Sequence, residues 1–285
     1  MRHINSISCG QGAPSLFLIV MAGELKLFPA DCVIVADTGW ENDCLWSTGE
    51  RTTAREFFDV VTKPLAAQYG IDAVMVRSRN ENGEDYLSIP DYITSKVNED
   101  SKYGYASIDI PMFGSDGGRM KQSCTSKWKI QAIRQELRRQ GATSSTTALG
   151  LHLDEVHRCK PSQVKWDVSI WPLVDMGQRQ DGSIGGLGIG RSWSRIDIQG
   201  EMERRGIPYL VTTECDGCPH KDWKRWKRTS PATIDELAEF EAQFNGEFFL
   251  TNHRIPLKES LARMEADNAI GANLFDGCDS GYCFV

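Results

Sequence analysis

The fold is decided by Ser6-Ile-Ser-Cys-Gly-Gln-Gly-Ala-Pro-Ser15, which Cys32-Val-Ile-Val-Ala-Asp-Thr-Gly39 follows. Residues 2–7 predict a short strand, the glycine-rich segment a turn, and the apolar run 16–22 a helix that begins near Ser15. Glycines let the backbone approach an anion closely, and a helix start aims free N–H groups at it. This layout predicts a nucleotide pocket at the carboxyl edge of a parallel sheet. An ordinary strand–turn–helix unit is the alternative.

The composition is that of a soluble globular protein: of 285 residues, 40% are apolar and 25% are charged. A net charge of −7 argues against broad, non-specific binding to nucleic acid, so any such contact needs a local basic patch. The apolar run 16–22 is far shorter than the roughly 20 residues that cross a bilayer. Because no basic-then-apolar leader precedes it, we expect a cytoplasmic protein that does not enter a membrane.

Strand and helix patterns alternate up to about residue 153. Apolar strands are predicted at 31–36, 72–77 and 144–153, and helices at 53–69 and 126–140. Such alternation predicts an α/β fold with a Rossmann-like, doubly wound parallel sheet. We expect a nucleotide-binding domain over residues 1–175 and a helical, cysteine-containing region over 176–285 that packs against it.

The segments outside this alternation carry weaker signals. Residues 101–118 suggest a mobile flap, and the glycine-rich stretch 182–190 a flexible loop. A short helix is predicted at 196–205. Thr233-Ile-Asp-Glu236 has the pattern of a capping box, which opens a helix that ends near residue 244.

Five of the nine cysteines suggest a metal site. In Cys215-Asp-Gly-Cys218, two thiolates separated by two residues can point at one ion, and Gly217 permits the tight turn. The motif alone suits an iron–sulfur cluster, zinc or a redox pair. Because a closed site needs four ligands, we hypothesise a [4Fe-4S] cluster, with zinc as the alternative. Its ligands would be Cys124, Cys215, Cys218 and Cys283, with Cys278 as the substitute.

Basic and aromatic residues surround these cysteines. The cations are Arg119, Lys121, Lys127, Lys129, Lys221, Lys224, Arg225, Lys227 and Arg228, and the interleaved tryptophans are Trp128, Trp223 and Trp226. Cations can bind phosphates while aromatic rings stack on bases, so DNA or RNA is a candidate partner. The alternative is a solvated helix face whose tryptophans turn toward the core.

Taken in order, these motifs resemble the phosphoadenosine phosphosulfate reductase-like proteins of phages and bacteria. That family belongs to the PP-loop, or adenine-nucleotide alpha-hydrolase, superfamily. The resemblance rests on residues 6–16, 32–41, 124–130, 215–219 and 278–285. It implies a HUP-type fold that binds ATP or another adenine nucleotide, with the turn at 8–13 around the phosphates.

The resemblance also implies a chemistry. A substrate nucleophile attacks the α-phosphate of ATP, pyrophosphate leaves with the help of Mg²⁺, and sulfur from a donor replaces the activated oxygen. We therefore expect a sulfur-transfer enzyme that acts on nucleic acid or on a nucleotide. The expected catalytic residues are Asp37, Cys124 and Lys129. The expected nucleotide-binding residues are Ser6, Ser8, Gly10, Gly12, Ser15, Asp37, Thr38 and Gly39.

One departure from the family pattern bears on activity. The family's phosphate turn carries a serine where this chain has Gly12-Ala13. Alanine donates no side-chain hydrogen bond, and losing a donor to a charged group costs on the order of 1.5–3 kcal/mol. A catalytically degenerate protein that binds nucleotide or nucleic acid is therefore one alternative. A sulfonucleotide reductase is another, because Cys283 lies close to the C-terminus.

Overall fold

The computed structural model describes residues 2–97 and 109–269, which divide into two compact units. Unit 1 combines Met1–Asp37, Cys44–Glu84 and Lys129–Thr213, and unit 2 combines Thr38–Asp43, Asp85–Trp128 and Glu214–Val285. The boundary predicted at residue 175 lies inside unit 1. Both units are therefore assembled from segments that are distant in the sequence.

Unit 1 is built on a seven-stranded sheet with the order β10-β9-β8-β7-β1-β2-β5. Its strands are β1 (His3–Ser8), β2 (Cys32–Ala36), β5 (Asp72–Val76), β7 (Ser144–Leu149), β8 (Asp167–Trp171), β9 (Met176–Gln178) and β10 (Ile184–Gly186). The neighbouring strands β8, β7, β1, β2 and β5 pair parallel. Strand β9 pairs antiparallel with β8 and with β10. In chain order the parallel strands run 3-2-1-4-5, so the topological switch point lies between β1 and β7. The predicted α/β fold with a mostly parallel sheet is confirmed.

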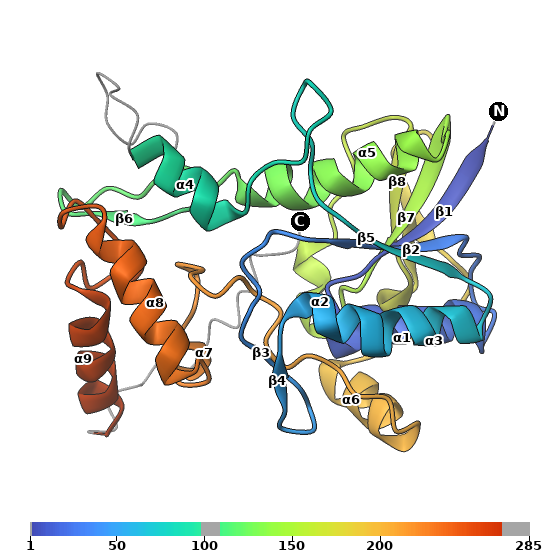
Figure 1. The fold of residues 1–285 in the computed structure, drawn as a ribbon. Coiled ribbons are helices and arrows are strands. Elements are labelled where there is room, and N and C mark those ends of the chain that lie inside the picture. The colour runs from blue at the N-terminus through green and yellow to red at the C-terminus, as the bar shows by residue number, and fades with distance from the viewer. Residues whose placement is uncertain (1, 98–108, 270–285) are drawn as a thin grey trace. The chain divides into compact units, whose positions relative to one another are not determined.

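Helices cover both faces of this sheet, as Figure 1 shows. On one face α1 (Ala13–Gly23), α3 (Lys63–Gln68) and α6 (Arg195–Arg204) contribute to an apolar core with Ile7, Val33 and Val35. On the other face α5 (Gln131–Arg139) packs through Ile133 and Leu137 on Ile4 and Ile34. Successive residues of a strand therefore pack against helices on opposite faces of the sheet.

The two helices predicted at 53–69 and 126–140 are present, and each contains a π-helical segment. The segment predicted at 53–69 consists of α2 (Ala54–Phe57), a π-helical turn η1 (Phe58–Thr62) and α3. The segment predicted at 126–140 consists of a π-helical η2 (Thr125–Ile130) followed by α5. Two short strands, β3 (Cys44–Leu45) and β4 (Arg51–Thr52), precede α2.

Two sequence predictions in unit 1 need correction. The strand predicted over 144–153 ends at Leu149, and the chain then enters a 3-10 helix, η3 (Leu153–Arg158); a second one, η4 (Pro172–Val174), follows β8. The segment 182–190, predicted as a flexible loop, contains β10. The carboxylate of Asp175 accepts hydrogen bonds from the N–H groups of Leu187, Ile189 and Gly190 and holds this hairpin.

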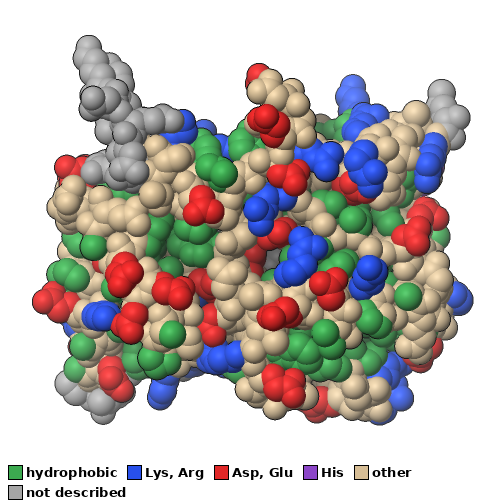
Figure 2. All heavy atoms as spheres, viewed as in Figure 1, with side chains coloured by type: hydrophobic (Ala, Val, Ile, Leu, Met, Phe, Trp, Pro, Cys, Tyr) green, Lys and Arg blue, Asp and Glu red, His purple; other side chains and the backbone are tan. Residues whose placement is uncertain are grey.

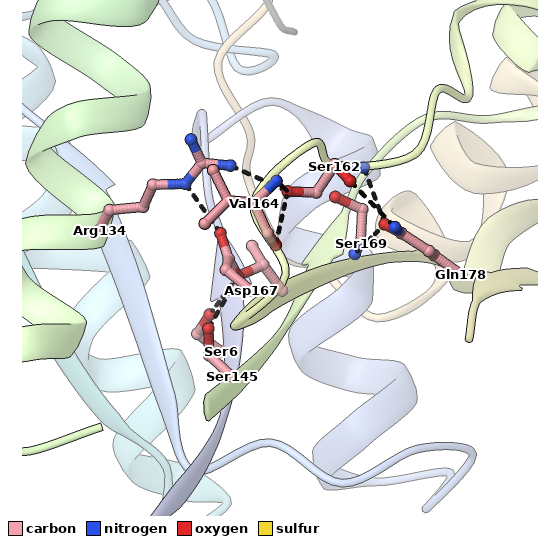
Figure 3. A network of polar contacts seen from close by, with 9 residues as sticks. Ser6, Arg134, Ser145, Ser162, Val164, Asp167, Ser169 and Gln178 are labelled. Carbon is pink, nitrogen blue, oxygen red and sulfur yellow. Dashed lines mark hydrogen bonds and ion pairs between the residues drawn. The ribbon is translucent and has the colours of Figure 1, made fainter. Parts of the chain in front are cut away.

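A buried polar network supports the sheet at the start of β8 (Figure 3). The Oδ1 of Asp167 accepts hydrogen bonds of 2.8 Å from the hydroxyls of Ser145 and Thr147, and Arg134 donates to Oδ2 at 3.0 Å. Thr147 also pairs with Ser6 at 3.1 Å. Because Asp167 is the first residue of β8, the network is centred on the amino edge of the sheet, opposite the edge where ligands bind in such folds.

Unit 2 is mainly helical. Its elements are α4 (Ile89–Val97), β6 (Phe113–Gly114), α7 (Trp223–Trp226), α8 (Pro231–Ala242), β11 (Phe248–Phe249) and α9 (Leu257–Ala269). Strand β6 lies in the region predicted as a flap, whose residues 101–108 lie outside the described part, and it pairs antiparallel with β11. The predicted cap at Thr233 is wrong: Ser230 caps α8 and accepts a hydrogen bond from the Thr233 N–H.

Within the described ranges, every helix is too short or too polar to cross a bilayer.

Candidate functional site

The turn after β1 leads directly into α1. Gly12 is the N-cap of this helix, and none of the described side chains caps its first turn. Cys9 lies beneath the turn: its Sγ accepts the Gln11 N–H at 3.4 Å and faces the Ser15 hydroxyl at 3.6 Å. Gly12 also forms a parallel β-bridge with Leu210, which engages the backbone on one side of the turn. Because no described side chain caps this helix start, its remaining backbone N–H groups are candidates for binding an anion.

The loop after β7 touches this helix start. A Cβ built on Gly150 would lie 2.9 Å from the Ser15 nitrogen and 3.1 Å from the Pro14 carbonyl carbon. A side chain at position 150 therefore cannot fit without moving the first turn of α1. The loops that follow β1 and β7 thus meet at the topological switch point, where ligands bind in doubly wound sheets.

His152 follows Gly150 and is almost fully buried. Its Nε2 lies 3.2 Å from the Glu155 carboxylate, and its Nδ1 lies 3.1 Å from Asp154 without forming a hydrogen bond. Burial lowers the pKa of His152, which favours the neutral imidazole. Glu155 also pairs with Arg158. Sequence analysis assigned these residues no role, although a histidine, two acids and an arginine directly follow a strand end.

Three buried polar atoms at the carboxyl edge of the sheet have no hydrogen-bond partner among the described residues. They are Ser78 Oγ, His152 Nδ1 and Trp171 Nε1. Ser78 follows β5, His152 follows β7, and Trp171 ends β8. Buried polar atoms are usually satisfied. These three follow or end different strands, and β5 and β8 are the outermost of the parallel strands, so they do not define one site by themselves.

Asp37 follows β2 and is held by two arginines. Its Oδ2 accepts from Arg77 at 2.9 Å and from Arg55 at 3.2 Å, and its side chain is 16% exposed. The carboxylate is thus neutralised by its own unit. Both arginines contact Oδ2, so a Mg²⁺ ion at this carboxylate would have to bind close to two cations.

The other predicted nucleotide-binding residues differ in burial, in hydrogen-bond partners and in the unit to which they belong. Ser6 is buried and paired with Thr147, so we leave it out of the proposed site. Ser8 and Gly10 are half-buried, at the end of β1 and in the turn. Thr38, whose hydroxyl donates to Glu41 at 2.5 Å, and Gly39 belong to unit 2. Of the predicted catalytic residues, Asp37 and Lys129 belong to unit 1 and Cys124 to unit 2.

The Cys215–Cys218 segment is a tight turn in which the Cys218 N–H donates to the Cys215 carbonyl at 3.0 Å. Cys215 Sγ donates to Glu41 Oε1 at 3.4 Å. The buried Asp216 carboxylate accepts the Asn42 N–H at 2.8 Å, and burial raises the pKa of Asp216 to about 6. A Cβ on Gly217 would lie 2.1 Å from the Trp40 ring, so this turn requires glycine.

Cys124 is half-buried and packs on the apolar cluster that contains Cys215 and Cys218. The segments also meet through His220, whose Nε2 lies 3.0 Å from Gln122 Oε1. In the described part of the chain, however, no three Cys, His, Asp or Glu side chains are arranged to hold a metal. Cys278 and Cys283 lie outside that part, so the four-cysteine site stays a prediction.

Searches against protein-family models and curated proteins found no match for this chain. The resemblance to the reductase-like family therefore rests on the motifs alone.

The tryptophans of the predicted nucleic-acid surface are mostly core residues. Trp128 is 0% exposed and Trp226 is 2% exposed, whereas Trp223 is half-buried. The alternative interpretation is thus confirmed for the first two, which cannot stack on bases. Lys127 lies 3.7 Å from the Tyr92 ring centroid and 2.9 Å from Asp109. On the face shown in Figure 2, Lys and Arg side chains are interspersed with Asp and Glu.

Proposed function

We propose that unit 1 binds a nucleotide at the carboxyl edge of its sheet. The phosphates would lie against the turn at Cys9–Gly12 and the first turn of α1. The observation that carries this proposal is the contact of Gly150 with Ser15 and Pro14. It brings two loops together at the switch point, beside a helix start that no described side chain caps.

ATP is the nucleotide that the family resemblance favours. Attack on its α-phosphate develops negative charge as pyrophosphate leaves, and fixed N–H groups of α1 would stabilise that charge. His152 is buried at the same edge and is the candidate proton acceptor, with Arg195 Nε 3.5 Å from its Nε2. Mg²⁺ would arrive with the nucleotide rather than on Asp37.

We further propose that the attacking oxygen belongs to a nucleic acid or nucleotide. Sulfur from a donor then displaces this adenylylated oxygen, and AMP is the leaving group. The two cysteines of the Cys215–Cys218 turn fit half of an iron–sulfur or zinc site. The described residues do not complete that site. A nucleic-acid partner would be bound by cations rather than by Trp128 or Trp226.

A binding protein without turnover is the second candidate. It is supported by Ala13, which is 4% exposed and packs in the apolar core. A serine hydroxyl at this position would enter that core. The sulfonucleotide reductase alternative depends on Cys283, which lies outside the described residues.

Calorimetric titration with Mg-ATP, followed by a pyrophosphate-release assay with and without added DNA or RNA, tests the proposal. We expect the wild type to bind and Gly150→Ala to weaken binding at least tenfold. Gly200→Ala is the matched control, because a Cβ there meets nothing within 4 Å. Absence of wild-type binding, or equal affinities of both variants, would contradict the site. Binding without pyrophosphate release would favour the second candidate.

A further inference from the structure

Gln11 has an unusual backbone conformation at the centre of the turn. Its φ is +64°, in the left-handed region that favours glycine, and its side chain is 2% exposed. A non-glycine residue persists in this region only where its surroundings determine it, and such positions gather at functional sites. The contacts of Gln11 therefore show what maintains the turn.

All of the polar groups of Gln11 are engaged. The side-chain Nε2 donates to the Ala54 carbonyl at 3.0 Å, and Oε1 accepts from the Thr62 hydroxyl at 3.0 Å. The backbone carbonyl accepts the Leu210 N–H at 3.1 Å, and the backbone N–H donates to Cys9 Sγ. These bonds fix the peptide planes on both sides of Gln11.

The side-chain partners of Gln11 belong to a continuous helical segment, α2 followed by η1. Its start is fixed by a capping box between Thr53 and Glu56. The π-helical turn η1 ends at Thr62, which is 0% exposed. Mid-helix π turns occur frequently at functional sites.

The same first turn of α2 also holds the acid after β2. Ala54 accepts the Gln11 amide, and the next residue, Arg55, donates to Asp37. One helix start therefore anchors both the turn after β1 and the residue after β2. Neither anchor depends on a bound ligand.

We propose that Gln11 is a positioning residue: its buried side chain braces the turn so that the N–H groups around Gly12 face the phosphates. The inference rests on the proposed nucleotide site, but Gln11 itself does not touch the ligand. It predicts that the hydrogen bond from Thr62, which lies 51 residues from Gln11 in the sequence, affects the affinity for phosphate.

Three variants test the brace. Gln11→Gly accepts the positive φ but lacks the side chain. Thr62→Val keeps the shape of Thr62 and removes its hydroxyl, whereas Thr62→Ser keeps the hydroxyl and is the matched control. Each is measured by amide hydrogen exchange over residues 9–14, with residues 144–149 as the internal reference, and by titration with Mg-ATP.

We expect exchange over residues 9–14 and the dissociation constant for Mg-ATP to rise about tenfold in Gln11→Gly and Thr62→Val. Thr62→Ser should match the wild type. Wild-type exchange or wild-type affinity in both impaired variants overturns the inference. If Gln11→Gly does not fold, Thr62→Val decides. If the wild type binds no ATP, the proposed function fails. Amide hydrogen exchange over residues 9–14 then tests by itself whether Gln11 braces the turn.

Discussion

The Arg77 guanidinium lies 2.9 Å from the Asp37 carboxylate and joins the carboxyl ends of β5 and β2. Arg55 reaches the same oxygen at 3.2 Å. The acid that sequence analysis placed beside the nucleotide is therefore a shared partner of two cations. A phosphate that arrives at this edge would compete with Asp37 for those arginines.

The ion pair should contribute measurably to stability because Asp37 is only 16% exposed. A double-mutant cycle with Asp37→Asn and Arg77→Met should give a coupling energy of about 0.5–1 kcal/mol in urea unfolding. The control is the exposed pair Lys258–Asp235, whose side chains are 61% and 63% exposed and whose coupling should be close to zero. Equal coupling energies in the two cycles would show that the Asp37–Arg77 ion pair stabilises the fold no more than an exposed pair does.

Cys9 should make stability fall at alkaline pH. Burial raises the pKa of the Cys9 thiol from 9.0 to about 11, so the unfolded chain loses this proton first. The stabilisation is present below pH 9 and is lost as the pH rises from 9 to 11, by up to about 2–3 kcal/mol.

Urea unfolding at pH 8 and pH 10.5 would measure this effect. The wild type should lose more stability over that interval than Cys9→Ala. Cys32 and Cys159, whose pKa values burial raises to about 12 and about 11, titrate in both proteins and cancel. Parallel pH profiles would show that Cys9 does not titrate in this range.

Asp167→Ala should reduce the free energy of unfolding by about 3 kcal/mol. It leaves Arg134 and the buried hydroxyls of Ser145 and Thr147 without their shared acceptor. Ser162→Ala removes one hydrogen bond to Arg134 and should cost about 1 kcal/mol. Mg-ATP affinity should be unchanged in both, since the network is centred on the amino edge. A large loss of affinity would place Asp167 in the site.

Metal content tests the cysteine hypothesis. Protein purified without oxygen should contain iron and sulfide, and Cys215→Ala and Cys218→Ala should lose both. Cys283→Ala should behave like them and Cys278→Ala like the wild type, whereas the opposite result makes Cys278 the fourth ligand. Cys159→Ala is the matched control. Stoichiometric zinc would support the alternative metal, and protein free of both metals would contradict the site.

The sequence predicted features that depend on local residues. The turn between residues 8 and 13 and the apolar run 16–22 specify β1, the turn and α1 within one short segment. The alternation up to about residue 153 predicted the parallel strands β1, β2, β5 and β7, but it did not include β8. These elements could be predicted without contacts between distant residues.

The remaining features depend on contacts between distant residues. Strand β10 lies in a glycine-rich segment and is held by Asp175, and Gln11 is braced by Thr62. The sequence left open whether Trp128 is an accessible ring or a core residue; it lies in the core of unit 2, and its indole donates to the Leu87 carbonyl. Residues 38–43 join residues 214–218 through Asp216. No local pattern indicates these pairings.

The central claim is that the turn after β1 binds nucleotide phosphates, and a crystal structure with Mg²⁺ and a non-hydrolysable ATP analogue tests it most directly. We expect phosphate oxygens within hydrogen-bond distance of the backbone N–H groups of Gly10 and Gly12, beside Gly150. An analogue bound elsewhere, with those N–H groups turned away from it, would contradict the account.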